Sequence, residues 1–333
     1  MIVDVHAHGL SEEFIVETAR GVGCEWRVEI AAPRRYVAAD YGVLDPLLYD
    51  IEGRLASLRE RDIGLQLVGP PPPLVSSLGH AASIAYSRRL NRSTGRFVAE
   101  SEGLMAGLAS PAVGEPSGAA EELRRVIDEY GFPGVLLPTS VDGVPLDGAQ
   151  FEPLFTAIEE LKLLAFMHPV SSRLSADLRD YTMSILIGWP TETTVAVTRL
   201  SFAGVLARHP QLKLVLAHGG GTLPYLLGRI DLGYSAPQYE RNPDCRSNIA
   251  HRPSDYLRQL YFDTTVCDPK SLDFLIGQVG ADHVLFGSDF PYEIGDADGA
   301  IALPAIRVME ASLRALLLST NAERLLGLTA GPR

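Results

Sequence analysis

Short apolar runs rich in β-branched residues alternate with longer amphipathic segments along most of the chain. Continuous apolar runs are typical of strands buried in a parallel sheet, and apolar positions that repeat every three or four residues are typical of helices. The runs predict eight strands, at residues 1–8, 63–69, 103–110, 134–139, 163–169, 213–221, 260–265 and 283–292. The helical repeats predict helices at residues 11–21, 51–62, 81–99, 117–130, 151–161, 193–210, 222–231 and 311–326.

Eight strands with helices between them predict an α/β fold, a (β/α)₈ TIM barrel, whose functional residues lie at the carboxyl ends of the strands. The 333 residues suit one barrel domain spanning residues 1–333. Residues 9–50 show weak periodicity, so we expect a small insertion after the first strand, at the barrel mouth. The alternative, an open doubly wound sheet, is disfavoured because no Gly-x-Gly-x-x-Gly turn follows that strand.

Composition narrows the possible partners and the compartment. The formal net charge of −12 argues against nucleic acid or an anionic membrane as a partner. No apolar run approaches the roughly 20 residues of a membrane span, and charged residues occupy the place of a signal-peptide core. The three cysteines, Cys24, Cys245 and Cys267, form no Cys-x-x-Cys pair and are predicted to be reduced thiols. We therefore expect a cytoplasmic protein.

Residues that can bind a metal or transfer a proton follow four of the eight predicted strands. His6 and His8 share one face of the first strand, and His168, His218 and Asp289 end three later ones. Each alone has an ordinary explanation, such as a hydrogen bond at a strand end. In a barrel, however, these ends surround one opening, so the residues can meet. Imidazoles with a carboxylate suit one divalent ion, Zn²⁺ first, with Mn²⁺ or Fe²⁺ as alternatives.

Two further carboxylates could support that site. Asp4 lies two residues before His6 on the same strand face, and Asp263 ends the seventh predicted strand. Either could accept the second ring N–H of a metal-binding histidine, which is the usual supporting arrangement. The alternative for each is a hydrogen-bonded carboxylate in the barrel floor.

Several motifs, spread in order over nearly the whole chain, carry a resemblance to a known family. They are VDVHAH, GFPGVLL, MHP, GWPTETTVAV, HPQLKLVLAHGGGTLPYLLGRID, LYFDTT and VLFGSDFPY. With these motifs the chain resembles the amidohydrolase superfamily, in the branch of the 2-amino-3-carboxymuconate-6-semialdehyde decarboxylase-like, metal-dependent aromatic-acid decarboxylases.

The resemblance implies a barrel that holds one divalent ion. Four residues match the ligands of that ion: His6, His8, His168 and Asp289. His218 matches the histidine that activates the metal-bound water. Arg229 matches an arginine that reaches the site of a neighbouring subunit and holds a substrate carboxylate, which implies a functional homodimer.

The chain also departs from the family pattern. No lysine ends the fourth predicted strand, where relatives with two metal ions carry a carboxylated lysine, so one ion is expected. Ile185 occupies the position of an active-site tryptophan of the namesake enzyme, and Arg34 and Arg35 are the nearest candidates for a second carboxylate-binding arginine. These departures concern the substrate rather than the chemistry.

We therefore predict a carboxy-lyase: a metal-dependent, non-oxidative decarboxylase of a small aromatic or muconate-type carboxylic acid. His218 would be the general acid or base, Asp289 a ligand and candidate proton carrier, and Arg229 a substrate-carboxylate binder. The alternative is a metal-dependent hydrolase or hydratase that uses the same residues on a lactone, an amide or an unsaturated acid. A metal-binding scaffold without turnover is a third possibility, but it would not need His218 beside an open site.

Overall fold

The computed structural model describes residues 1–21, 26–38, 42–76, 83–170, 178, 180–236 and 243–328. Eight strands pair in parallel, in the order β1-β5-β6-β7-β10-β11-β12-β13. Their bounds are β1 (Ile2–His8), β5 (Ile63–Gly69), β6 (Met105–Ala109), β7 (Gly134–Pro138), β10 (Leu164–His168), β11 (Lys213–Leu216), β12 (Leu260–Asp263) and β13 (Val284–Leu285). Each one overlaps a strand predicted from the apolar runs.

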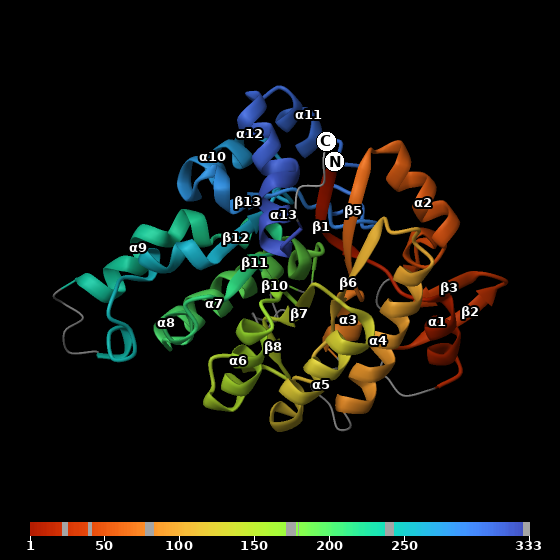
Figure 1. Ribbon diagram of the computed structural model, residues 1–333, viewed down its shortest axis with the longest axis horizontal. Helices are drawn as coiled ribbons and strands as arrows, with labels where there is room; N and C mark the ends of the chain where they lie inside the picture. The colour runs from red at the N-terminus through yellow and green to blue at the C-terminus, as the bar shows by residue number, and fades with distance from the viewer. Residues whose placement is uncertain are drawn as a thin grey trace.

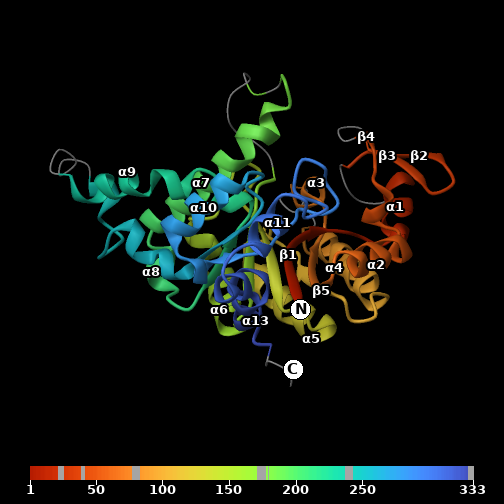
Figure 2. The same cartoon turned by 90° about the horizontal axis from the view of Figure 1, so that it is seen from above.

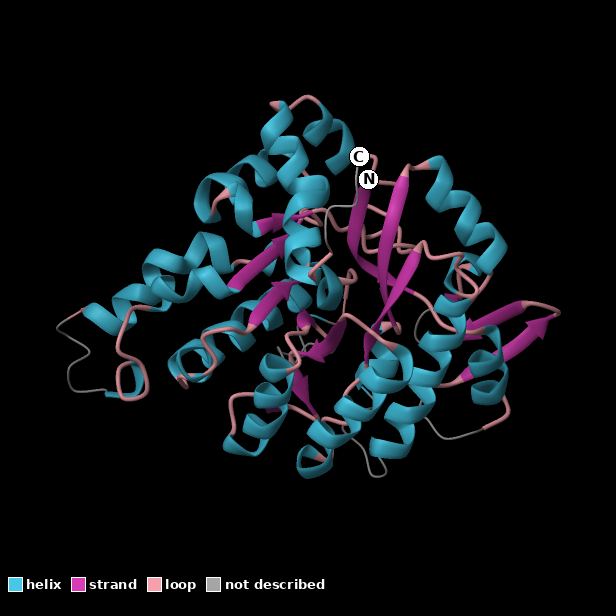
Figure 3. Ribbon diagram, viewed as in Figure 1, coloured by secondary structure: helices cyan, strands magenta, loops and turns pink. Residues whose placement is uncertain are grey.

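The first and last strands approach each other and nearly close the sheet into a barrel. The main-chain N–H of Val5 donates to the carbonyl of Phe286 over 2.9 Å, and Ala7 forms a parallel bridge with Phe290. The strands form a ring with the helices outside it (Figures 1 and 3). The predicted (β/α)₈ barrel is confirmed.

Amphipathic helices cover the outside of the barrel. Helix α5, for example, turns Leu123 and Val126 inward, where both are almost fully buried. Burying such a side chain stabilises the fold by about 1.5–3 kcal/mol. The helices are α1 (Glu12–Ala19), α2 (Ile51–Glu60), α3 (Pro72–Ser76), α4 (Ser83–Ala99), α5 (Pro116–Tyr130), α6 (Glu152–Glu160), α7 (Trp189–Phe202), α8 (Val205–Arg208), α9 (Leu223–Ser235), α10 (Pro269–Val279), α11 (Ala302–Arg307), α12 (Ala311–Ala315) and α13 (Asn321–Leu326). Among the described residues, no helix combines the length and apolar character needed to cross a membrane.

Two predicted helices are interrupted. The helix expected at 193–210 begins earlier, at Trp189, and divides into α7 and α8 at Gly204. Gly204 has φ +76°, and a Cβ atom there would lie 2.4 Å from the carbonyl oxygen of Asn248, so the chain turns where only glycine fits. The helix expected at 311–326 consists of α12 and α13 joined by a π-helical turn at Leu316–Thr320. Helices α10 and α11 were not predicted from the pattern.

Residues 9–50 hold α1 and a small antiparallel sheet. The strands of that sheet are β2 (Val28–Ala32), β3 (Arg35–Ala38) and β4 (Gly42–Val43), and they lie beside α1, outside the ring of barrel strands (Figures 1 and 2). A second small hairpin joins β8 (Ser140–Val141) to β9 (Val144–Pro145). The segment after β4 returns to the barrel mouth, where Leu10 N–H donates to the carbonyl of Leu48 over 3.0 Å.

Candidate active site

Four side chains that sequence analysis proposed as metal ligands meet at one end of the barrel. His6 and His8 come from β1, His168 ends β10, and Asp289 follows β13. One potential ligand atom from each of the four lies within 4.8 Å of the other three. All four residues are buried, with at most 2% of their surface exposed.

Main-chain carbonyls fix the orientation of two of these histidines. His8 Nδ1 lies 3.1 Å from the carbonyl oxygen of Pro70, and His168 Nδ1 lies 2.6 Å from that of Pro169. A carbonyl only accepts hydrogen bonds, so each Nδ1 carries the proton and each Nε2 keeps its lone pair. Burial lowers the pKa of both rings, that of His168 well below its usual range, so both are neutral at neutral pH.

Asp263 holds the third histidine in the same way. Its Oδ2 atom lies 2.6 Å from Nδ1 of His6, and its Oδ1 accepts the N–H of Gly219 over 2.8 Å. Burial alone would lower the pKa of His6, but the charges and hydrogen bonds of Asp289 and Asp263 outweigh it and raise that pKa to about 10. His6 is therefore an imidazolium when no metal ion is bound.

The arrangement suits a cation at the centre. The Nε2 atom of His168 is buried and has no hydrogen-bond partner among the described residues, and Nε2 of His6 lies 3.2 Å from Oδ1 of Asp289. Nε2 of His8 lies 3.0 Å from Oδ1 of Asp289. Both atoms present lone pairs, which repel each other unless a cation lies between them. Burial raises the pKa of Asp289, but the charge of His6 and hydrogen bonds from His218 and His6 hold it well below its usual range. Three imidazole nitrogens and one carboxylate form a donor set that fits a divalent metal ion.

His218 lies beside this cluster and is more open to solvent. Its Nε2 atom is 3.5 Å from Oδ2 of Asp289, and its side chain is 14% exposed, against 1% for His6. A three-glycine turn follows it, and a Cβ atom on Gly221 would lie 1.9 Å from the carbonyl oxygen of Pro190. Glycine is therefore required for the chain to turn this closely behind His218. The result is one imidazole next to, but not within, the four-residue cluster.

The two candidate supporting carboxylates have different roles. Asp263 accepts from His6, as that hypothesis proposed. Asp4 does not contact an imidazole nitrogen and instead belongs to the barrel floor. Its Oδ2 atom accepts from Gln66 Nε2 over 2.7 Å and from Ser288 Oγ over 2.6 Å.

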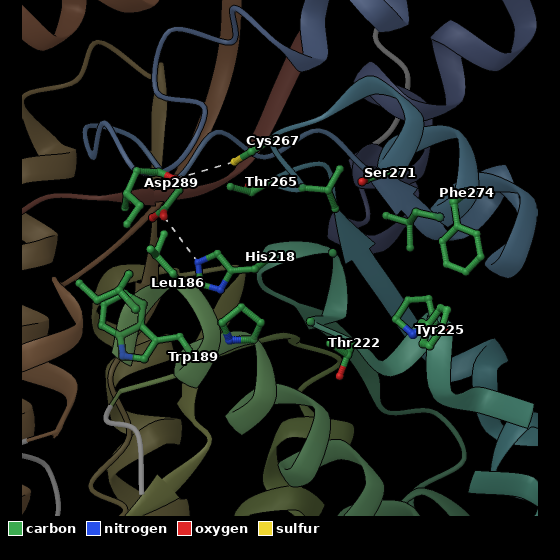
Figure 4. Close-up of a pocket in the computed structure, with 18 residues that line it drawn as sticks. Leu186, Trp189, His218, Thr222, Tyr225, Thr265, Cys267, Ser271, Phe274 and Asp289 are labelled. Atoms are coloured by element: carbon green, nitrogen blue, oxygen red, sulfur yellow. Dashed lines mark hydrogen bonds and ion pairs between the residues drawn. The ribbon is translucent and has the colours of Figure 1, made fainter. Parts of the chain in front are cut away.

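A mostly apolar cavity of about 490 Å³ opens beside His218 and Asp289. Figure 4 shows these two residues facing each other at one end of it, with Tyr225 and Phe274 at the other end. Trp189 packs beside His218, with ring centroids 6.3 Å apart and an interplanar angle of 26°. The cavity therefore offers a flat, apolar surface next to His218, the partly exposed histidine of the site.

The other sequence-predicted residues lie at different places. Ile185 lines the cavity, but Arg34 and Arg35 do not. Arg34, in the turn between β2 and β3, instead pairs with Glu12 of α1 and with Asp50, which precedes α2, at 3.3 and 3.0 Å. The charge of Arg34 is thus paired within the insertion rather than directed toward the cavity. The end of β7 carries no lysine, in agreement with the sequence.

Arg229 lies on α9 and is exposed. It makes no hydrogen bond or ion pair with any residue in the described ranges, and it is not among the described residues that line the cavity. The neighbouring Asp231 bonds elsewhere, to the N–H and Oγ of Ser254 at 3.0 and 2.6 Å. The simple pair of Arg229 with Asp231 that its spacing allows is therefore not formed.

Cysteines contribute one lining residue that sequence reasoning passed over. Cys245 and Cys267 are free thiols, and Cys24 lies outside the described residues. Cys267 lines the cavity, where burial and the carboxylates of Asp296, Asp263 and Asp289 raise its pKa to about 11. It is therefore a neutral thiol at neutral pH. The one sequence signal for this position is that Cys267 follows the end of the predicted strand at 260–265, where residues of the barrel mouth are expected.

Comparison with known proteins identifies relatives over most of the chain. The sequence profile of a family described as amidohydrolase matches residues 3–328. A 2-amino-3-carboxymuconate-6-semialdehyde decarboxylase from Dictyostelium discoideum is 29% identical over 287 residues, covering 86% of this chain and 79% of that protein. A gamma-resorcylate decarboxylase from Rhodococcus jostii is 30% identical over 272 residues, covering 75% of this chain and 80% of that protein.

Solved structures share the fold. A dihydroxybenzoic acid decarboxylase from a Polaromonas species superposes with a TM-score of 0.78 and 24% sequence identity. The match covers 99% of this chain and 98% of that one. The Polaromonas structure contains bound manganese and an inhibitor, 2-nitroresorcinol.

Proposed function

The chain belongs to the amidohydrolase family, and from that membership and the site we propose that it is a metal-dependent, non-oxidative decarboxylase of a small aromatic or muconate-type carboxylic acid. The relatives named above as decarboxylases support this reaction class. The observation that carries the proposal is the position of His218 and Asp289, which lie where the candidate metal cluster meets an apolar cavity of about 490 Å³.

His6, His8, His168 and Asp289 would hold the metal ion. When bound, a divalent ion acts as a Lewis acid toward a substrate oxygen and can lower the pKa of a water ligand to about 7. Asp263, Pro70 and Pro169 keep the three imidazoles oriented toward it through their Nδ1 atoms. These contacts are made within the protein itself and hold the imidazoles in the orientation that an ion would need.

His218 and Asp289 would manage the proton. In a non-oxidative decarboxylation the bond between the ring carbon and the carboxylate breaks, the electron pair stays on carbon, and a proton replaces the departing CO₂. Nε2 of His218, 3.5 Å from Asp289, is in reach of a ring bound beside Trp189 and can deliver or remove that proton. The apolar walls exclude water around the reacting carbon, which strengthens electrostatic interactions there.

The identity of the metal, the subunit arrangement and the compartment are parts of the same proposal. Zn²⁺ suits three imidazoles and one carboxylate, with Mn²⁺ and Fe²⁺ as alternatives, and the Polaromonas structure holds manganese. A homodimer would let Arg229 of each chain reach the neighbouring site and bind a substrate carboxylate. The free thiols Cys245 and Cys267 fit a reducing, cytoplasmic setting.

The test is a decarboxylation screen. Protein reconstituted separately with Zn²⁺, Mn²⁺ and Fe²⁺ is incubated in D₂O with hydroxybenzoates, aminobenzoates and muconates. We expect CO₂ release, with deuterium appearing at the carbon that carried the carboxylate, and loss of both in His218→Asn. Hydrolysis of lactones or amides without CO₂ release from any acid would reject the proposal and favour the hydrolase alternative.

A further inference from the structure

A second cavity, of about 450 Å³, lies beside the first. Its walls combine residues of the insertion with residues that follow Asp289 in sequence. Most of the lining is apolar or aromatic, and includes Trp26, Val43, Leu44, Leu48, Pro291 and Tyr292. The insertion therefore builds one side of a cavity whose other side is the segment carrying a candidate metal ligand.

Only two of the described lining residues belong to both cavities. Ile185 precedes α7 and is half-buried, and Ile294, five residues after Asp289, is 41% exposed. Their side chains are the shared boundary between the two spaces. Both side chains are apolar and partly exposed, so the boundary between the two spaces includes two isoleucine side chains at the surface of the site.

The candidate metal centre lies against both cavities. His218 and Asp289 line the first cavity. Tyr292 lines the second, and its ring packs on that of His8 with centroids 5.3 Å apart. A ring bound for reaction at His218 and Asp289 can therefore extend a substituent past Ile185 and Ile294 into the second cavity.

The charges around the second cavity exclude an anion. Among the described residues that line either cavity, none is arginine or lysine. Two carboxylates line the second one, Asp45 and Glu293. Asp45 Oδ1 also accepts the N–H of Leu47 over 2.7 Å, so its carboxylate is fixed in place. An anionic group there would be repelled and would lose its hydration without a partner.

We propose that the second cavity binds an uncharged, apolar ring substituent of the substrate, such as an alkyl, alkoxy or aryl group, and that Ile185 and Ile294 limit the size of this group. This inference rests on the proposed function for the identity of the reacting acid. Any carboxylate of the substrate stays in the first cavity, beside His218 and Asp289. The native substrate is then a substituted aromatic acid, selected through the insertion.

Val43 and Ile30 offer a matched pair of positions for the test. Both lie on the small sheet of the insertion and are exposed to a similar degree, 53% and 48%. Val43 lines the second cavity, whereas Ile30 lines neither. Val43→Trp should fill part of the second cavity, and Ile30→Trp should place the same side chain on the same sheet away from either cavity. Equal thermal unfolding of the two variants and the wild type verifies that each is folded.

The measurement is kcat/KM along a series of 2-hydroxybenzoates whose ring carries hydrogen, methyl, ethyl, propyl or carboxyethyl at position 4 or 5. Each methylene buried should raise kcat/KM about fourfold, so the propyl acid should exceed the parent by roughly 60-fold in the wild type. We expect the same ratio in Ile30→Trp and a ratio near one in Val43→Trp. The carboxyethyl acid should be a poorer substrate than the propyl acid.

Binding separates this inference from the proposed function. A nitro group is isosteric with a carboxylate, so 4-alkyl-2-nitrophenols can be titrated into the metal-loaded protein by calorimetry without turnover. An affinity that increases with alkyl length in the wild type, but not in Val43→Trp, would support substituent binding in the second cavity even if no acid released CO₂. An increase that survives in Val43→Trp, or tighter binding of the carboxyethyl compound, would overturn the inference while leaving decarboxylation intact.

Discussion

Nη1 of Arg54 donates a hydrogen bond of 2.8 Å to the main-chain carbonyl of His8, from a side chain that has no exposed surface. The same nitrogen donates to the carbonyl of Leu47 over 2.9 Å, and Nε donates to Oε1 of Gln66 over 2.9 Å. Its guanidinium also lies over the ring of Phe290, 4.4 Å from the centroid. One buried cation thus contacts Leu47 of the insertion, Gln66 of β5, the main chain at the end of β1 and the ring next to Asp289. Burial lowers the pKa of Arg54 to about 9, so it stays charged at neutral pH.

Arg54→Met should therefore destabilise the protein strongly. It leaves the buried carbonyl of His8, the partly buried carbonyl of Leu47 and the side-chain amide of Gln66 without their donor, and a buried group left in this way costs about 1–3 kcal/mol. We expect the free energy of unfolding, measured by urea denaturation, to fall by about 3–5 kcal/mol. Arg59→Met is the control on the same helix, because Arg59 is 56% exposed and its one ion-pair partner in the described part of the chain is the exposed Glu102. Its loss should cost no more than about 1 kcal/mol. Equal effects of the two substitutions would contradict the role assigned to Arg54.

Removing two of the candidate ligands should remove the metal. We expect the His6→Ala/His8→Ala variant to lose most of its bound metal after dialysis, as measured by elemental analysis. Its melting temperature should no longer rise on adding Zn²⁺ or Mn²⁺, because a ligand stabilises only the state that binds it. His251→Ala is the control, since His251 is exposed and lies outside the cluster. Full metal retention in the double variant would remove the central claim.

Metal binding should also release a proton. His6 has a pKa of about 10 in the folded, metal-free protein, whereas His8 and His168 have lowered pKa values and are already neutral. Below pH 10 an incoming ion must displace one proton from His6, so affinity should increase about tenfold per pH unit from pH 7 to 9. Calorimetric titration in buffers with different ionisation enthalpies should report about one proton released per ion. No release at pH 8 would exclude a protonated His6.

The same pKa shift sets the pH dependence of the metal-free protein. The folded pKa of His6, about 10, lies above its ordinary value of 6.5. Its stabilising contribution is therefore complete below pH 6.5 and disappears as the pH rises through 10. Asp263→Asn removes one of the carboxylates that raise this pKa, so it should move the loss of stability to lower pH.

His218→Asn tests proton transfer separately from metal binding. Asparagine keeps the polarity of the position but cannot transfer a proton at neutral pH. We expect metal content to be unchanged and kcat to fall by roughly 10²–10⁴. Loss of metal in this variant would make His218 a ligand and require one of the other four to be reassigned. Unchanged kcat would exclude the acid–base role.

The sequence predicted the barrel and the residues of the cluster because both depend on local signals. Apolar runs mark the strands, and every parallel strand ends at the same side of a barrel, so His6, His168 and Asp289 could be brought together without coordinates. Asp4 and Asp263 could not be distinguished in this way. Both lie on strands near a histidine, and only the spatial position of Ser288 explains why Asp4 bonds in the floor instead.

Features built from distant segments had no signal in the sequence. Arg54 occupies a polar position of a predicted helix, where an arginine is ordinarily exposed, and nothing local indicates that it is buried against His8. The second cavity requires Val43 and Tyr292 to line the same space, although they lie far apart in the chain. The break at Gly204 depends on the carbonyl of Asn248, which is equally remote in sequence.

The last prediction concerns Arg229 and the contact between two copies of the chain. Arg229 is exposed on α9 and has no partner within the described ranges, although Asp231 is two residues away. Tyr225 and Leu232, four residues before it and three after it, are 80% and 55% exposed, so this helix face combines apolar side chains with an unpaired cation. Such a face suits contact with a second copy of the chain, in which Arg229 would find a carboxylate at the neighbouring active site.

Subunit mixing tests whether Arg229 acts in a neighbouring site. Arg229→Ala and His218→Asn chains, each expected to be nearly inactive alone, are unfolded together and refolded to allow exchange. In a dimer with shared sites, each mixed dimer has one site with both defects and one with neither. Random exchange makes half of the dimers mixed, so about a quarter of the wild-type kcat should return. If Arg229 acts within its own chain, every site of a mixed dimer keeps one defect and no activity returns. A chain with Arg229→Lys should be less active than the wild type, because lysine cannot bind a carboxylate through two parallel hydrogen bonds. Absence of recovery after exchange verified by mass spectrometry would exclude the trans role.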